Sequence, residues 1–126
     1  MIRIFCIAAL LAAGAPACLA AQDGKSVCPD ARTQHEMNVC AAQELARADR
    51  VLNERYPELV RTMPPVQLEL LRTAQRAWIR FRDAECAYQA SVFEGGSMQP
   101  MVRSSCLARL TEERAAELGE MLTEGA

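Results

Sequence analysis

The chain has 126 residues, and 14 Lys and Arg residues against 16 Asp and Glu residues give a formal net charge of −2. A slightly acidic chain argues against nucleic acid as a partner and mildly favours cationic partners. Its length suffices for one domain with an adequate but small core.

The first twenty residues have the pattern of a secretory signal peptide. An apolar run follows Arg3 and ends in small residues. The run is too short to remain as a membrane anchor, so we expect residues 1–20 to be removed and residues 21–126 to form a periplasmic or secreted domain. A lipoprotein signal would end at Cys18 instead, but the large aliphatic residue usual three positions earlier is missing. Membrane attachment is expected only if Cys18 is lipidated.

Four cysteines lie beyond this leader: Cys28, Cys40, Cys86 and Cys106. An even number in an exported chain predicts two disulfides. Three pairings of these cysteines are possible, and their spacing does not indicate which one forms. No CxxC pair occurs and His35 is the only histidine, so we expect no metal site.

The first helix is expected to begin at Thr33, which stands three residues before Glu36 in a capping-box pattern. Apolar residues recur at helical spacing from Met37 to Met63, and the segment "MPP" ends the helix. Pro57 is expected to kink it.

The second helix opens at Pro65 and continues to Tyr88, until "EGGSMQP" interrupts it; the third carries apolar residues from Cys106 to Leu122. No segment alternates like a strand. We therefore predict an all-α fold, an antiparallel three-helix bundle stapled by two disulfides. The apolar arc of the middle helix is wide, which predicts contact with both neighbours.

Several polar residues fall inside these apolar faces. They are Gln75, Arg82 and Glu85 on the middle helix, Glu44 on the first and Arg114 on the third. The turn positions place them at similar levels along the bundle, which predicts a buried polar network because unpaired buried charges are costly. We interpret it as structural; the alternative is a ligand site between the helices.

The turn from Glu94 to Pro100 is the candidate partner-binding site. Gly95 and Gly96 permit unusual backbone conformations, Ser97 adds a hydroxyl, and Met98 adds an adaptable apolar contact. These features suit a protruding tip that enters a partner's cleft. The alternative is a plain hairpin turn whose methionines cover the end of the bundle.

Catalytic patterns are weak. There is no Gly-rich phosphate loop, nucleophile elbow or Ser/His/Asp set, so we expect no enzyme and no cofactor. Glu44 and Glu85 would be the candidates for a glycosidase pair, but each is expected beside an arginine, which disfavours the protonated acid that such chemistry needs.

Four segments resemble the LprI-type lysozyme inhibitor domain: "TQHEMNVCAAQELARADRVLNERY", "LRTAQRAWIRFRDAEC", "GGSMQPM" and "CLARLTEERAAEL". The resemblance runs from about Cys28 to Leu118 and implies a small helical, disulfide-containing envelope protein, of a family with some lysozyme-inhibiting members. The matching positions are Gln34, Glu36, Met37, Asn38, Cys40, Glu44, Asp49, Leu52, Asn53, Tyr56, Gln75, Trp78, Arg82, Asp83, Cys86, Cys106, Leu107, Leu110, Thr111 and Arg114.

The resulting hypothesis is a periplasmic protein that binds lysozyme and blocks its active-site cleft. Lysozymes are often cationic around a cleft with two catalytic carboxyls, so an acidic partner would be steered toward them. We expect the Glu94–Pro100 turn to enter the cleft and Glu36, Glu112 and Glu113 to hold its cationic rim. The alternative is a non-catalytic envelope adaptor or small-ligand-binding helical module.

Overall fold

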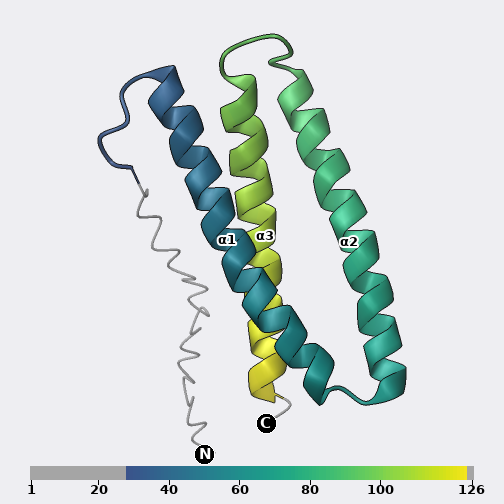
Figure 1. The fold of residues 1–126 in the computed structure, drawn as a ribbon. Coiled ribbons are helices and arrows are strands. Elements are labelled where there is room, and N and C mark those ends of the chain that lie inside the picture. The colour runs from purple at the N-terminus through teal and green to yellow at the C-terminus, as the bar shows by residue number, and fades with distance from the viewer. Residues whose placement is uncertain (1–27, 125–126) are drawn as a thin grey trace, which may run out of the picture.

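The computed structural model describes residues 28–124, which form α1 (Gln34–Thr62), α2 (Pro65–Ser91) and α3 (Gln99–Glu124). Figure 1 shows the chain descending along α1, returning along α2 and descending again along α3. No strand occurs in this part of the chain. The predicted all-α three-helix fold with two disulfides is confirmed. The predicted signal peptide and Cys18 lie outside the described residues.

The helix ends follow local sequence signals. The Thr33 hydroxyl accepts a hydrogen bond from the Glu36 amide at 3.2 Å, and the Glu36 carboxylate accepts one from the Thr33 amide at 2.9 Å. This capping box satisfies two of the amides that a helix start leaves unpaired. α1 continues through Pro57. α2 opens on Pro65 at its first position, where a missing amide is harmless.

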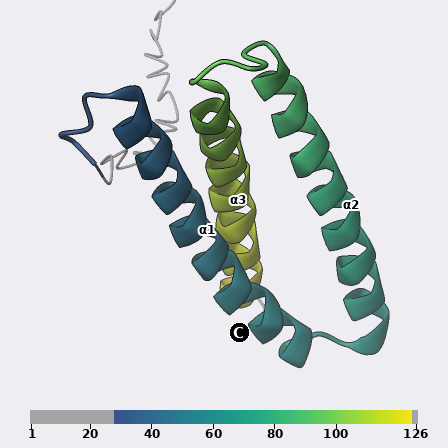
Figure 2. The ribbon, with the colours of Figure 1, turned by 45° about the horizontal axis from the view of Figure 1, so that its top comes forward.

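The helix at the centre of the fold is α3. Both α1 and α2 pack along it, whereas α1 and α2 have little contact with each other and diverge from their connecting turn (Figures 1 and 2). Small side chains line the contact between α1 and α3 and allow the two backbones to approach: Ala41, Ala48, Ala108 and Ala115 are all buried. Nearer the α1–α2 turn, Leu52, Leu59, Leu71, Ala115 and Leu118 form one apolar cluster.

The predicted contact of α2 with both neighbours is present, but its predicted wide burial is wrong, because α2 packs mainly on α3 and meets α1 at few points. Leu70, Phe81 and Tyr88 are all exposed. The face that α2 buries against α3 instead includes Gln75 and Cys86. A helical wheel measures the width of an apolar arc but not how many helices cover it, and here one helix covers part of it.

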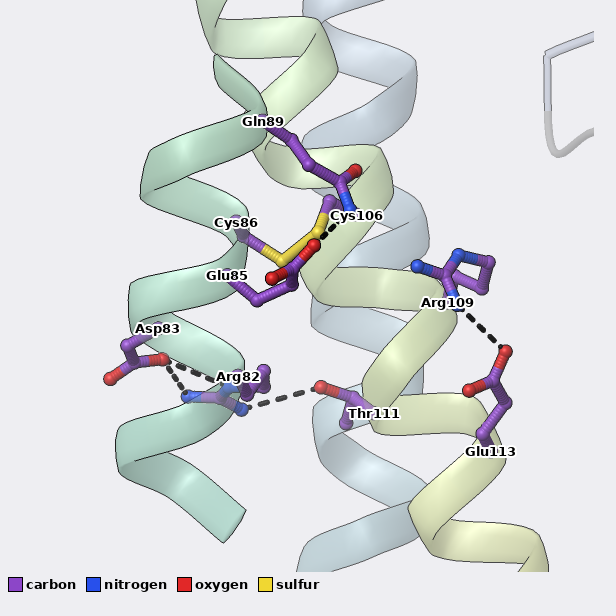
Figure 3. Close-up of a disulfide and its surroundings, with 9 residues drawn as sticks. All are labelled: Arg82, Asp83, Glu85, Cys86, Gln89, Cys106, Arg109, Thr111 and Glu113. Atoms are coloured by element: carbon purple, nitrogen blue, oxygen red, sulfur yellow. Dashed lines mark hydrogen bonds and ion pairs between the residues drawn. A yellow bond between two sulfur atoms is a disulfide. The ribbon is translucent and has the colours of Figure 1, made fainter. Parts of the chain in front are cut away.

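The two disulfides join Cys28 to Cys40 and Cys86 to Cys106, with Cα–Cα distances of 5.8 and 5.5 Å. The first ties the segment before α1 to the second turn of that helix. The second joins α2 to α3 in the interior, where Cys86 is fully buried (Figure 3). The pairing that spacing left open is thus one local bridge and one bridge between helices.

None of the described helices is long and apolar enough to cross a membrane.

Candidate partner-binding site

The connection between α2 and α3 forms one end of the molecule. All seven residues from Val92 to Met98 are exposed. The turn is nevertheless ordered by its own backbone, because the Gly96 amide donates to the Phe93 carbonyl at 2.9 Å and the Gln99 amide donates to the Gly96 carbonyl at 3.2 Å. Gly95 has φ +73°, a left-handed conformation that glycine adopts without strain.

The first two turns of α1 hold this connection in place. The Asn38 side-chain amide donates to the Ser97 carbonyl at 3.0 Å, and the Gln34 side-chain amide donates to Asn38 Oδ1 at 2.9 Å. The Gln34 amide also lies 3.7 Å from the Met101 sulfur. The turn is therefore fixed from two sides, by its own hydrogen bonds and by α1.

Apolar side chains protrude from this fixed turn. Val92, Phe93 and Met98 are all exposed large hydrophobic residues, and Glu94 is the charged residue among them. We call residues 92–98 the tip. The sequence prediction named Glu94, Gly95, Gly96, Ser97 and Met98, which the structure places together here. It missed Val92 and Phe93, although two large apolar residues at a helix end before a Gly-Gly pair were a visible signal.

The predicted acidic rim around the tip does not form as expected. Glu36 lies at the same end of the molecule, but its carboxylate accepts hydrogen bonds from the backbone amides of Arg32 and Thr33, which lower its pKa. Glu112 and Glu113 lie mid-way along α3, about 20 Å from the tip at 1.5 Å per residue. They pair there with Arg47 and Arg109, so the prediction that they flank the tip is wrong.

Three of the predicted network residues lie between α2 and α3. The Arg114 Nε donates to Gln75 Oε1 at 3.0 Å, and its Nη1 reaches Glu117 at 2.8 Å. The Arg82 Nη1 donates at 3.3 Å to the hydroxyl of Thr111, which is fully buried (Figure 3). The buried side-chain nitrogen and oxygen atoms of the described residues all have hydrogen-bond partners, which fits a structural role.

Arg82 also connects α2 to α1. Its guanidinium lies 2.9 Å from Asp83 and 3.7 Å from Asp49 of α1, and its Cζ stands 5.1 Å from the centre of the Trp78 ring. One side chain thus touches groups on all three helices.

The predicted membership of Glu44 and Glu85 in this network is wrong. Glu44 lines a surface hollow of about 270 Å³ with Cys40 and Ser105, away from both arginines. Glu85 accepts a hydrogen bond from Gln89 at 2.8 Å (Figure 3). The α1 residue that reaches Arg82 is Asp49, five residues after Glu44, so the turn positions give the wrong level along the bundle and no direction around the helix axis. The two carboxyls therefore do not form a pair.

Within residues 28–124, no cluster of three or more His, Cys, Asp or Glu side chains is arranged to hold a metal ion.

Fold and tip together define a small, disulfide-bonded helical protein with an ordered, exposed turn at one end. The family model of lysozyme inhibitor LprI matches residues 27–118, and the chain belongs to this family. It is 40% identical over 126 residues to the uncharacterized protein R02472 of Rhizobium meliloti (strain 1021), covering 90% of this chain and 89% of that protein. No solved structure matches significantly.

The family motif positions now acquire physical roles. Asn38 and Gln34 anchor the tip, whereas Gln75, Arg82 and Arg114 join the helices. Part of the signature therefore maintains the fold. Its polar residues at the start of α1 instead fix the shape of the candidate binding turn.

Proposed function

We propose that this protein is exported to the periplasm or secreted, and that it inhibits a lysozyme by inserting its tip into the active-site cleft. Membership of the lysozyme inhibitor LprI family supports the activity. The single observation that carries the assignment of the surface is the tip itself, an exposed apolar turn held in one conformation by Asn38. A preordered turn loses little conformational entropy on binding.

The chemistry of the tip suits a polysaccharide-binding cleft. Such clefts expose apolar walls to sugar rings and carry two carboxyl groups at the scissile bond. Val92, Phe93 and Met98 supply apolar contacts of adaptable shape. Glu94 would face the cationic rim, and the net charge of −2 favours encounter with a cationic enzyme.

A lysis assay with purified, oxidised protein and a c-type lysozyme tests the activity. We expect inhibition that saturates and is competitive with cell-wall substrate. Salt should weaken it, because part of the encounter is electrostatic. Full lytic activity at excess inhibitor would refute the proposal for that enzyme class. A folded protein without effect on any muramidase would favour the alternative of a non-catalytic envelope adaptor.

A pair of variants tests whether the tip is the binding surface. Met98 and Ile79 are each 39% exposed, but Met98 lies on the tip and Ile79 on α2. Met98→Asp should weaken inhibition at least about tenfold, since a charge would be buried against the cleft wall. Ile79→Asp should change inhibition less than about twofold. Equal effects of the two substitutions would show that the binding surface lies elsewhere.

A further inference from the structure

A row of apolar side chains runs along the outside of α2. It consists of Val66, Leu70, Ala74, Ala77, Phe81, Ala84 and Tyr88, all exposed. We call this row the α2 stripe. Its members recur every three or four residues, so they share one face of the helix. No charged residue interrupts the stripe, and it lies on a different side from the face that buries Gln75 and Cys86 against α3.

The exposure of the stripe is large for a small protein. Val66 is 76% exposed, Leu70 67%, Phe81 55% and Tyr88 70%. Single exposed apolar residues are ordinary, but contiguous patches of several hundred Å² mark interaction surfaces. We estimate that the stripe can bury on the order of 500 Å² per copy, or about 1,000 Å² in a symmetric pair. That area is at the lower limit for a specific interface.

We propose that the α2 stripe binds the same stripe of a second copy of this chain, with the two α2 helices antiparallel and Ala77 at the crossing point. This register matches large residues with smaller ones. Leu70 faces Ala84 of the second copy, and Phe81 lies level with Thr73, next to Ala74. At the two ends Val66 faces Tyr88. The central alanines let the helices approach closely, and each large side chain enters a space left by a small one.

The pattern favours the antiparallel orientation over the parallel one. Parallel helices would set Leu70, Phe81 and Tyr88 against their own copies and leave gaps at the alanines. They would also place Arg80, which flanks the stripe, beside the same arginine of the second copy. In the antiparallel register the two Arg80 residues are separated by about 9 Å along the helices, at 1.5 Å per residue. The antiparallel orientation also sets the positive end of each helix dipole beside the negative end of the other, which is favourable.

The dimer leaves the candidate binding turns accessible. Because the α2 helices run in opposite directions, the tips point toward opposite ends of the pair. Self-association and lysozyme binding therefore use separate surfaces, and each is tested without the other.

Sedimentation equilibrium of the oxidised protein between roughly 5 and 500 μM measures the association, since an interface of this size predicts a weak dimer. Phe81→Asp should raise the dimer dissociation constant at least about tenfold. The control, Ile79→Asp, changes an exposed apolar residue of α2 outside the stripe and should have less than about a twofold effect. A monomer throughout this range, or a dimer insensitive to Phe81→Asp, overturns the proposal.

Cysteine crosslinking tests the register. An Ala77→Cys variant should form a disulfide-linked dimer under mild oxidation, because the two-fold axis passes this position. Ala87→Cys, also exposed on α2 but outside the stripe, should not. Equal crosslinking of both variants contradicts the register. Binding of a monomeric protein to vesicles of anionic phospholipid would show instead that the stripe contacts lipid, and would likewise overturn the proposal.

Discussion

Arg82→Ala removes the side chain that connects all three helices. The Arg82 side chain is 18% exposed, donates to the buried Thr111 hydroxyl and faces the carboxylates of Asp49 and Asp83. It also stacks over Trp78. Truncation removes these interactions together, and alanine places nothing in the space that the aliphatic stem fills.

We estimate the loss of stability from the separate contacts. The hydrogen bond to Thr111 contributes about 1 kcal/mol, and the contact with Trp78 about 0.5 to 1 kcal/mol. The carboxylates of Asp49 and Asp83 are about half exposed, so each ion pair contributes only about 0.5 kcal/mol. Arg82→Ala should therefore cost about 2 to 3 kcal/mol. The loss would be larger if these carboxylates were buried, because they would then be left without a compensating charge.

Urea unfolding of the oxidised protein, followed by circular dichroism, measures this difference. The control is Arg76→Ala on the same helix, because Arg76 is exposed and bonds only to Thr73 at 3.2 Å among the described contacts. We expect a change within about 0.5 kcal/mol there. Losses that are equal within 0.5 kcal/mol for the two variants would refute the reasoning.

Replacing both Cys86 and Cys106 with alanine should cost about 3 kcal/mol in urea unfolding, because their bridge restricts the unfolded chain over a separation of 20 residues. Glu36→Ala should lower the melting temperature at neutral pH, and this difference should shrink as the pH falls below 4.5. The folded-state pKa of this carboxyl lies below the ordinary 4.5, so its contribution is present above that value and lost as the pH falls through the folded-state pKa. Asn38→Ala should weaken lysozyme inhibition several-fold, because it releases the Ser97 carbonyl and lets the tip sample other conformations.

Controls separate these effects from general loss of stability. Removing the Cys28–Cys40 bridge, with a separation of 12 residues, should cost less than removing the bridge between helices. A pH-independent effect of Glu36→Ala would exclude a role for its charge. For Asn38→Ala, inhibition is compared with that of Thr62→Ala, which removes a side-chain hydrogen bond at the opposite end of α1 from the tip. A loss shared by both would contradict a specific role in ordering the turn.

Local signals in the sequence predict most of the fold. The capping box at Thr33, the proline at the start of α2 and the Gly-Gly turn each act over a few residues, and the helices begin and end near them. The helical wheel also predicts that Arg114 and Gln75 lie at a helix interface, since each falls within an apolar face of its helix.

Contacts that depend on rotation about the helix axes are harder to predict. Glu44 lies beside Cys40 and Ser105, and Arg82 meets Asp49 instead, because nothing local determines the register of α1 against α2 or which of its faces meets α2. The exposed Phe81 and Tyr88 show the same limit, since apolar spacing does not reveal whether a neighbour is present. The anchoring of Ser97 by Asn38 spans 59 residues and has no local signature.

The position of α3 at the centre of the fold constrains when the protein can fold. Both α1 and α2 bury their faces on a helix that begins only at Gln99, and they scarcely touch each other. A chain whose last quarter has not yet emerged from the ribosome therefore lacks the surface on which its first two helices pack. Isolated helices of this length are marginal in water. Such a chain stays largely unfolded until its C-terminal helix is delivered.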